Sequence, residues 1–209
     1  MRKAAKRPDW KNGFLFLGNQ LSLDFVNTRP VQNGKPLELL LDFSALLRWF
    51  QAAGLLSSQE AGRLQRQWRG RASARKTTEA MRQLREKLRD DILAWEHSGA
   101  IRRSTVDALN RLMTDHPIRT RLTANGSTHS TELWFELHKP EDLFAPLAHS
   151  AATLFAAVDR KRVRKCAQCV LHFHDSSKKG TRRWCSMQLC GNRLKVAAYE
   201  ARRRQRTRK

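Results

Sequence analysis

The sequence predicts an α+β protein in two parts: a mostly helical N-terminal domain with one strand and a β-hairpin, followed by a small cysteine-based module. Apolar residues recur at helical spacing through most of the first 159 residues, whereas all four cysteines lie after residue 160. The charge distribution changes at the same point. Residues 160–209 contain 17 Lys and Arg and two acidic residues, whereas residues 1–159 contain 24 Lys and Arg and 17 acidic residues. We therefore expect two domains, 1–159 and 160–209.

Composition excludes several classes of protein. The 209 residues carry a formal net charge of +22, and 40% of them are hydrophobic, enough to bury a core rather than remain disordered. No apolar run approaches the ~20 residues that span a bilayer, and the segment FLFLG is too short for a signal peptide. We expect a cytoplasmic protein without a membrane anchor, and an anionic partner, with nucleic acid ahead of an acidic lipid surface.

The first predicted elements are a strand and four helices. Apolar and polar residues alternate over 21–25, which predicts a strand with one buried face. Helical stripes follow over 43–50 and 81–95, and these two helices are expected to end near Gly54 and Gly99. The predicted N-terminal caps are Asp42 for the first helix, Ser57 with Glu60 for the second, and Ser104 with Asp107 for a short fourth.

A hairpin and a final helix complete this domain. Residues 119–124 and 131–137 flank the pair Asn125-Gly126, a sequence typical of a tight β-turn between two strands. Pro140 begins an apolar helical segment that leads into the basic module.

Polar residues surround the predicted first strand. Asn19, Asp24, Asn27 and Thr28 are candidates for a ligand-binding pocket, although residues of these types more often cap helices and form turns. The sequence has no phosphate-binding glycine loop, no G-x-S-x-G and no H-E-x-x-H. We therefore predict that the protein is not an enzyme. An active site near Asp24 and Asn27 is the alternative.

The four cysteines have the spacing C-x2-C-x15-C-x4-C, formed by Cys166, Cys169, Cys185 and Cys190. Two close pairs of thiolates complete a tetrahedron around one ion, and in a cytosolic chain this pattern indicates zinc before disulfides. An iron–sulfur cluster is the alternative metal centre, which the small size and basic flanks disfavour. We expect one structural Zn²⁺, holding a treble-clef-like hairpin plus helix.

Basic residues flank the last two cysteines. After Cys190 the sequence predicts a helix with Lys195, Arg202 and Arg206 on one face, and Arg182 with Arg183 precede the third cysteine. Such a helix fits the DNA major groove or lies along phosphates. Nearby aromatic residues would equally suit stacking on unpaired RNA bases, and a solvated basic tail is the remaining alternative.

These residues resemble two known families. Residues 166–204 resemble the CGNR zinc finger, named for the tetrad that here spans residues 190–193. Residues 18–28, GNQLSLDFVNT, and residues 146–154, PLAHSAATL, resemble the opening motif and the closing helix of the ABATE domain, which is usually paired with this finger.

The resemblance implies a bacterial, stress-induced transcription regulator whose finger binds DNA while the upstream domain senses a small molecule. It implies that the four cysteines are zinc ligands, that Asn192 and Arg193 face DNA, and that the polar cluster around residues 19–28 lines the ligand pocket. An RNA-binding or ribosome-associated protein is the first alternative function. Many such regulators form homodimers, and the sequence leaves the oligomeric state open.

Overall fold

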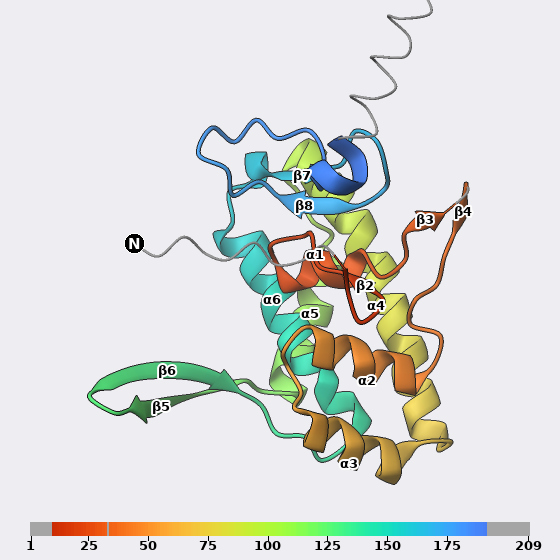
Figure 1. Cartoon of the computed structure of the whole chain (residues 1–209), viewed down its shortest axis with the longest axis vertical. Coiled ribbons are helices and arrows are strands. Elements are labelled where there is room, and N and C mark those ends of the chain that lie inside the picture. Colours follow the sequence, from red (N-terminus) through yellow and green to blue (C-terminus); the bar gives the residue numbers. More distant parts are fainter. Residues whose placement is uncertain (1–9, 33, 192–209) are drawn as a thin grey trace, which may run out of the picture.

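The computed structural model describes residues 10–32 and 34–191, and over these ranges it is an α+β structure of helices and four two-stranded antiparallel sheets (Figure 1). The predicted basic helix lies outside the described residues, and so do the five predicted nucleic-acid contacts that follow Cys190. These contacts are Asn192, Arg193, Lys195, Arg202 and Arg206.

The helices lie close to the predicted segments, except that residues 21–26 form a helix where a strand was expected. The helices are α1 (Leu21–Val26), α2 (Phe43–Ala52), α3 (Ser58–Trp68), α4 (Ala72–Ser98), α5 (Arg103–Asp115) and α6 (Phe144–Ala157). Shorter turns of helix occur at Pro140–Leu143, Arg160–Arg162 and Met187–Gly191. In the described part of the chain, no helix is both long enough and apolar enough to cross a membrane.

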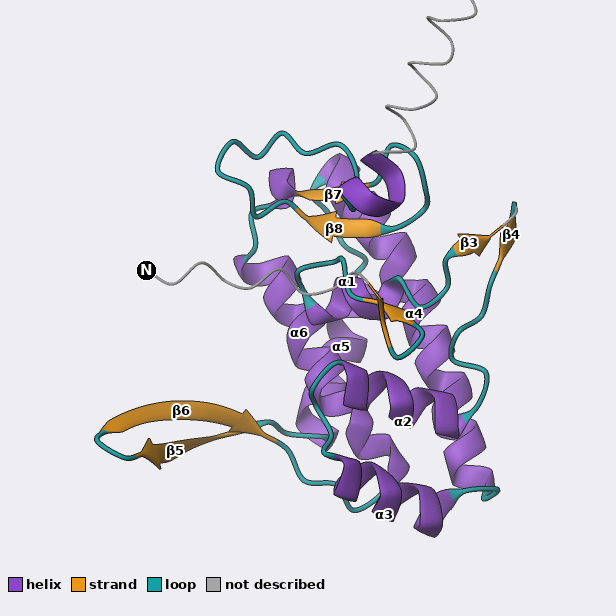
Figure 2. Cartoon of the chain, viewed as in Figure 1, coloured by secondary structure: helices purple, strands orange, loops and turns teal. Residues whose placement is uncertain are grey.

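The strands form four separate antiparallel pairs (Figure 2). The pairs are β1 (Trp10–Lys11) with β2 (Phe14–Leu15), β3 (Val31–Gln32) with β4 (Lys35–Pro36), β5 (Arg119–Asn125) with β6 (Thr128–Trp134), and β7 (Val163–Lys165) with β8 (His172–His174). The pair β7–β8 carries the cysteine module at one end of the helical body.

The main core lies where α1, α2, α4 and α6 meet. Trp49 of α2 is fully buried there, with its ring centroid 5.5 Å from that of Phe25 and 5.1 Å from that of Phe50. Edge-on and tilted contacts of this kind add to the stabilisation from apolar burial. This core fixes α1, and α1 in turn contacts the cysteine module.

A buried ion pair fastens the loop before α2 to the long helix α4. The Arg85 guanidinium is almost wholly buried, donates to Glu38 at 2.7 Å and to the Thr28 hydroxyl at 3.1 Å, and pairs with Glu86 as well. A buried guanidinium is tolerated only when its donors are satisfied in this way.

Most of the predicted helix ends are confirmed. The Asp42 carboxylate accepts from the Ala45 backbone N–H at 2.7 Å, and Ser57 with Glu60 forms a full capping box. Gly54 and Gly99 follow α2 and α4 with φ of 79° and 80°, left-handed values that favour glycine.

The predicted cap of the fourth helix is wrong. The helix α5 begins at Arg103, and its N-cap Arg102 makes no side-chain capping bond. Asp107 instead pairs with Arg103 at 3.0 Å, one turn apart on the helix surface. The Asp107 carboxylate, which the predicted capping box would use, is thus engaged in an ion pair with Arg103.

The predicted first strand is also wrong, because residues 21–26 form the helix α1. Alternation indicates a strand only when the polar residues face water, and in α1 the polar residues are buried too. The Ser22 N–H donates to the Ser150 hydroxyl at 3.0 Å, and the Asp24 carboxylate accepts from the Gly18 N–H at 2.7 Å. The polar residues of α1 are therefore explained by these buried hydrogen bonds and not by exposure to water.

The predicted hairpin is confirmed, but its second strand begins three residues earlier than expected. Pairing continues to Asn125 opposite Thr128, leaving the two-residue turn Gly126-Ser127. A two-residue turn permits pairing up to its edge, so the turn itself is shorter than the sequence pattern indicated.

The capping box at α3 gives a direct test of the local structure. We expect Ser57→Ala to lower the free energy of unfolding by about 1 kcal/mol, because the Glu60 N–H loses its acceptor. Urea denaturation measures the change. Ser58→Ala is the matched control, since Ser58 is the first residue of the helix rather than its cap. Equal losses in the two variants would show that the cap is not the source of stability.

Candidate metal centre and its attachment to the helical domain

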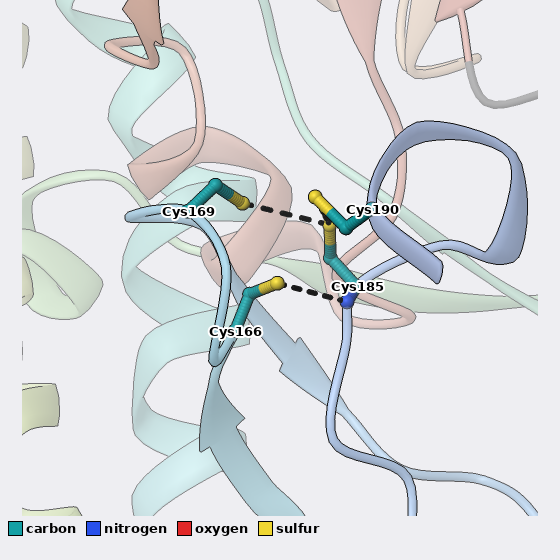
Figure 3. A group of neighbouring side chains, drawn as sticks. All are labelled: Cys166, Cys169, Cys185 and Cys190. Carbon is teal, nitrogen blue, oxygen red and sulfur yellow. Dashed lines mark hydrogen bonds between the residues drawn. The ribbon is translucent and has the colours of Figure 1, made fainter. Parts of the chain in front are cut away.

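The four cysteines come from two segments of the module. Cys166 and Cys169 lie in the turn after β7. Cys185 lies two residues before the helical turn Met187–Gly191, and Cys190 lies within it. Figure 3 shows the four side chains pointing toward one another. The β7–β8 hairpin and this turn therefore place two sulfurs each around one point, as the sequence predicts.

The sulfur positions fit a tetrahedral metal ion. All four Sγ atoms lie within 4.8 Å of one another, and both the Cys169–Cys185 and the Cys185–Cys190 pairs are 3.7 Å apart. Four sulfurs bound to one Zn²⁺ at about 2.3 Å lie roughly 3.8 Å from each other. A disulfide would need a separation of about 2 Å, and all four cysteines are free.

The thiols are arranged so that a cation is needed to ionise them together. Hydrogen bonds from the Cys169 and Cys185 thiols lower the pKa of Cys166, and the bond to Cys166 raises the pKa of Cys169 to about 12. Burial raises the pKa of Cys190. A divalent soft cation removes this competition by binding all four thiolates, and the closed set of four sulfurs suits a structural ion.

The apolar surroundings of the cysteines are shared with the N-terminal segment. Leu171 and Phe173 from the module are buried against the cysteines, together with Leu15 of β2 and Leu17 just after it. This second core is separate from the main core around Trp49. Since the module is small, the leucines of residues 15–17 supply apolar contacts that it could not provide alone.

Asn27 binds the module through the backbone of β8. Its side-chain NH₂ donates to the His172 carbonyl at 2.8 Å, and its side-chain carbonyl accepts from the His172 N–H, also at 2.8 Å. The amide thus occupies the edge of β8 that β7 leaves free, in the manner of a neighbouring strand. Both bonds are buried, so water cannot replace them.

Gly18 and Asn19 extend this contact by two residues. The His174 N–H donates to the Gly18 carbonyl, and the Asn19 side chain donates to the His174 carbonyl, both at 2.8 Å. Gly18 also packs tightly against α1, since a Cβ here would lie 2.6 Å from the Cβ of Leu23 and 2.8 Å from the Asp24 backbone nitrogen. Only glycine allows this approach.

The four residues predicted to line a ligand pocket therefore all have partners within the protein. Asn19 and Asn27 bind β8, Asp24 accepts from Gly18, and Thr28 donates to the Phe25 carbonyl at 2.7 Å. Asn19 and Asn27 thus lie at the contact with the module, whereas Thr28 also accepts from the buried Arg85 on the side of the helical core. Ligand binding by these side chains stays a prediction, and it would require these hydrogen bonds to exchange.

The C-terminal end of α4 holds the opposite side of the module. Arg160 donates to the Glu96 carbonyl at 2.9 Å, and the Lys165 N–H donates to the Glu96 carboxylate at 3.1 Å. A guanidinium at a helix C-terminus satisfies carbonyls that lack helical partners. The module is consequently fixed from two directions, by α1 and by α4.

The two predicted nucleic-acid contacts that the structure describes differ in their surroundings. The Arg182 guanidinium lies 4.8 Å from the Phe173 ring centroid and donates to the Trp184 carbonyl at 2.8 Å. The backbone N–H of Arg182 donates to the buried Asp175 carboxylate, which also accepts from the Ser177 backbone N–H. The side chain of Arg183 is exposed. Arg182 is thus held within the module, and Arg183 is free to reach a ligand.

Comparison with protein families matches nearly the whole chain. Residues 19–158 match the ABATE family, described as "Putative stress-induced transcription regulator", and residues 162–203 match the CGNR zinc finger. The chain belongs to the ABATE family. A search of curated proteins finds no match.

The cysteine cluster is accordingly the metal centre of a CGNR zinc finger, consistent with one structural zinc. Gly191, the glycine of the tetrad, lies close to the side chains of Met187 and Trp184. A Cβ there would lie 2.6 Å from the Met187 sulfur and 3.0 Å from the Trp184 indole nitrogen. Both are side-chain atoms, so a Cβ here would require Met187 or Trp184 to shift.

A separate pocket of about 190 Å³ lies in the ABATE domain, away from the finger. It is lined by the end of α5, the base of the β5–β6 hairpin and the start of α6, with His116 bound to Asp142 at 3.2 Å. No sequence pattern indicates this pocket, because its lining residues come from segments on both sides of the β5–β6 hairpin.

Asn27→Ala tests the attachment of the finger. The variant leaves a buried N–H and a buried carbonyl of His172 without partners, so we expect a loss of roughly 2–4 kcal/mol in unfolding free energy. Asn19→Gly is the control, because glycine tolerates the left-handed φ of 57° at this position and the variant removes only one exposed bond, worth at most about 1 kcal/mol. Similar losses in chemical denaturation would contradict the role assigned to Asn27.

His172 predicts how stability depends on pH. Its ring is buried, and neither ring nitrogen is bonded to any residue that the structure describes. Burial, with the nearby charges of Arg89 and Lys165, lowers its pKa from 6.5 to about 4. The unfolded chain therefore binds a proton that the folded chain does not, and stability falls as the pH drops below about 6.5. We expect a loss of about 1 kcal/mol between pH 7 and pH 5.5 from this group.

The comparison with His172→Phe isolates this contribution. The variant should lose about 1 kcal/mol less than the wild type over the same pH interval, measured by denaturation with zinc content checked at each pH. A wild type and variant with the same pH dependence would contradict the assignment to His172.

Proposed function

We propose that this ABATE protein is a DNA-binding transcription regulator in which the zinc finger contacts DNA and the N-terminal domain responds to a small ligand. One observation carries the proposal: a metal-stabilised, basic finger is attached to a domain of a regulator family by a buried, bidentate contact. A rigid attachment gives the N-terminal domain a means to position the finger.

The charge of the described finger supports a polyanionic partner. Residues 160–191 contain nine Lys and Arg against a single acid, Asp175, and that carboxylate is buried. Five of these bases are exposed, namely Lys161, Lys165, Lys178, Lys179 and Arg183. Binding that rests on such contacts follows phosphate charge and weakens steeply with salt.

The enzymatic alternative receives no support from Asp24 and Asn27. Asp24 is buried and accepts from the Gly18 N–H, and both polar atoms of the Asn27 side chain are bonded to His172. A general acid or base needs to reach a substrate, whereas the Asp24 carboxylate is buried and the Asn27 amide is bonded to the finger. We therefore propose a non-enzymatic role.

Sensing would act through the contact between α1 and β8. The helix α1 packs on α4 and α6 as well as on the finger, so a ligand that shifts α1 within the N-terminal domain would also move β8. Such coupling requires the ligand to prefer one arrangement of α1 over another.

The first experiment measures zinc content and salt-titrated binding to random duplex DNA and to RNA on one preparation. We expect one zinc per chain, and tighter binding to DNA than to RNA at matched salt. If about six phosphates are neutralised, affinity should fall by roughly three orders of magnitude between about 50 and 200 mM salt. Preference for RNA, or no affinity for either, would overturn the proposal.

Arg183→Ala and Arg182→Ala should differ in kind. The first is expected to reduce the slope of log affinity against log salt by about 1 with the finger intact, because its side chain is exposed. The second should instead lower finger stability by about 1–2 kcal/mol, because it removes the contact with Phe173 and the bond to Trp184. DNA titrations and thermal unfolding distinguish them, and an unchanged salt slope for Arg183→Ala would contradict the assignment.

A further inference from the structure

The β5–β6 hairpin projects from the helical body into solvent (Figures 1 and 2). Its side chains from Arg119 to Leu133 are exposed or nearly so wherever the structure describes them, and it belongs to a sheet of only two strands. A two-stranded hairpin is marginally stable in water unless something packs on one of its faces. This hairpin therefore lacks the support that its length requires.

The two faces of the hairpin differ in chemistry. On one face Arg121 pairs with Glu132 at 3.1 Å, and Thr123 bonds Ser130 at 3.0 Å, so the polar groups satisfy one another across the strands. The strand register places Leu122 and Leu133 on the opposite face. This face, which we call the leucine face, is formed by Thr120, Leu122, Ala124, His129, Thr131 and Leu133.

The two leucines of the leucine face are uncovered by the described residues. Leu122 is 70% exposed and Leu133 is 59% exposed, and they lie diagonally across the strand pair. Burial of two such side chains stabilises a contact by about 3–6 kcal/mol before the cost of association. Pairing through the free strand edges would leave both leucines in water, so a partner has to cover the face itself.

We propose that the leucine face binds the same face of a second copy of this chain, forming a symmetric dimer. Electrostatics selects this partner. The chain carries a net charge of +22, so two copies repel each other over most of their surface. The leucine face has no Asp, Glu, Lys or Arg, and the hairpin as a whole balances Arg119 and Arg121 with Glu132 and Glu136.

Position favours the same partner. Because the hairpin stands away from the helices (Figure 1), contact between two hairpins keeps the cationic bodies apart. An acidic protein or a nucleic acid would be drawn to the basic surfaces instead. A symmetric interface also needs only one self-complementary patch, and two leucines facing two leucines provide it.

The size of the face sets the expected affinity. Six residues cover less than the ~800 Å² per partner of a standard interface, so we expect association in the micromolar range rather than a permanent dimer. If the proposed function holds, the dimer would bring two fingers to one DNA molecule. Sedimentation of the protein without DNA tests the dimer independently of that function.

Sedimentation velocity on the zinc-loaded full chain, from low to high micromolar concentration, tests the proposal. We expect a monomer–dimer equilibrium in the wild type and a monomer throughout for the double variant L122K/L133K. Zinc content and circular dichroism verify that the double variant retains its fold, since its changes lie on an exposed hairpin.

Two control variants locate the interface. Leu41→Lys adds one positive charge at a leucine that is 69% exposed but lies before α2, and Ser130→Lys adds one to the other face of the hairpin. Both should dimerise as the wild type does. A monomeric wild type, a dimer that survives L122K/L133K, or loss of the dimer in Leu41→Lys or Ser130→Lys would overturn the proposal.

Discussion

The amide of Asn27 replaces a strand at the edge of β8, and the placement of the zinc finger depends on it. Up to residue 191 the finger has one hairpin, β7–β8, so the outer edge of β8 would otherwise present the His172 N–H and carbonyl to a partly apolar boundary. Asn27 satisfies both groups at 2.8 Å. Buried backbone groups rarely remain unpaired because each costs free energy when water is excluded. Burial of this edge of β8 therefore requires a partner for both backbone groups, and Asn27 is that partner.

The same boundary joins the metal centre to the helical domain. Leu15 and Leu17 pack in one cluster with three of the cysteines, Leu171 and Phe173, so the core of the finger is not contained within the finger's own sequence. Zinc supplies the strongest organising force in so small a module. Together with Arg160 on the carbonyls of α4, these contacts fix the finger from both sides. Zinc binding, docking and the orientation of the basic surface are therefore physically linked.

Sequence alone predicted the features that have local signatures. The spacing of the cysteines identified the metal site, the Asn-Gly pair identified the β5–β6 hairpin, and the capping pattern at Ser57 identified the start of α3. Each depends on residues close together in the chain. The strand predicted at residues 21–25 failed because both the apolar and the polar residues of α1 are buried, which removes the relation between polarity and exposure.

The attachment of the finger had no such signature. Asn27 and His172 are 145 residues apart, and the bonds involve the backbone of His172, which any residue would provide. In the sequence, Leu15 and Leu17 are recognisable only as members of a short apolar run, which does not indicate their contact with the finger. The polar residues of the 18–28 motif were correctly singled out, but their chemistry alone fits a pocket and a docking contact equally well.

Amide hydrogen exchange with and without zinc tests the shared boundary most directly. If the finger and the helical domain are joined as described, removing zinc with a chelator will deprotect residues 163–191 and, with them, the amides of residues 15–28, while α2 and α3 keep their protection. Loss of protection confined to residues 163–191 would contradict the account, because it would show that the N-terminal segment does not depend on the finger.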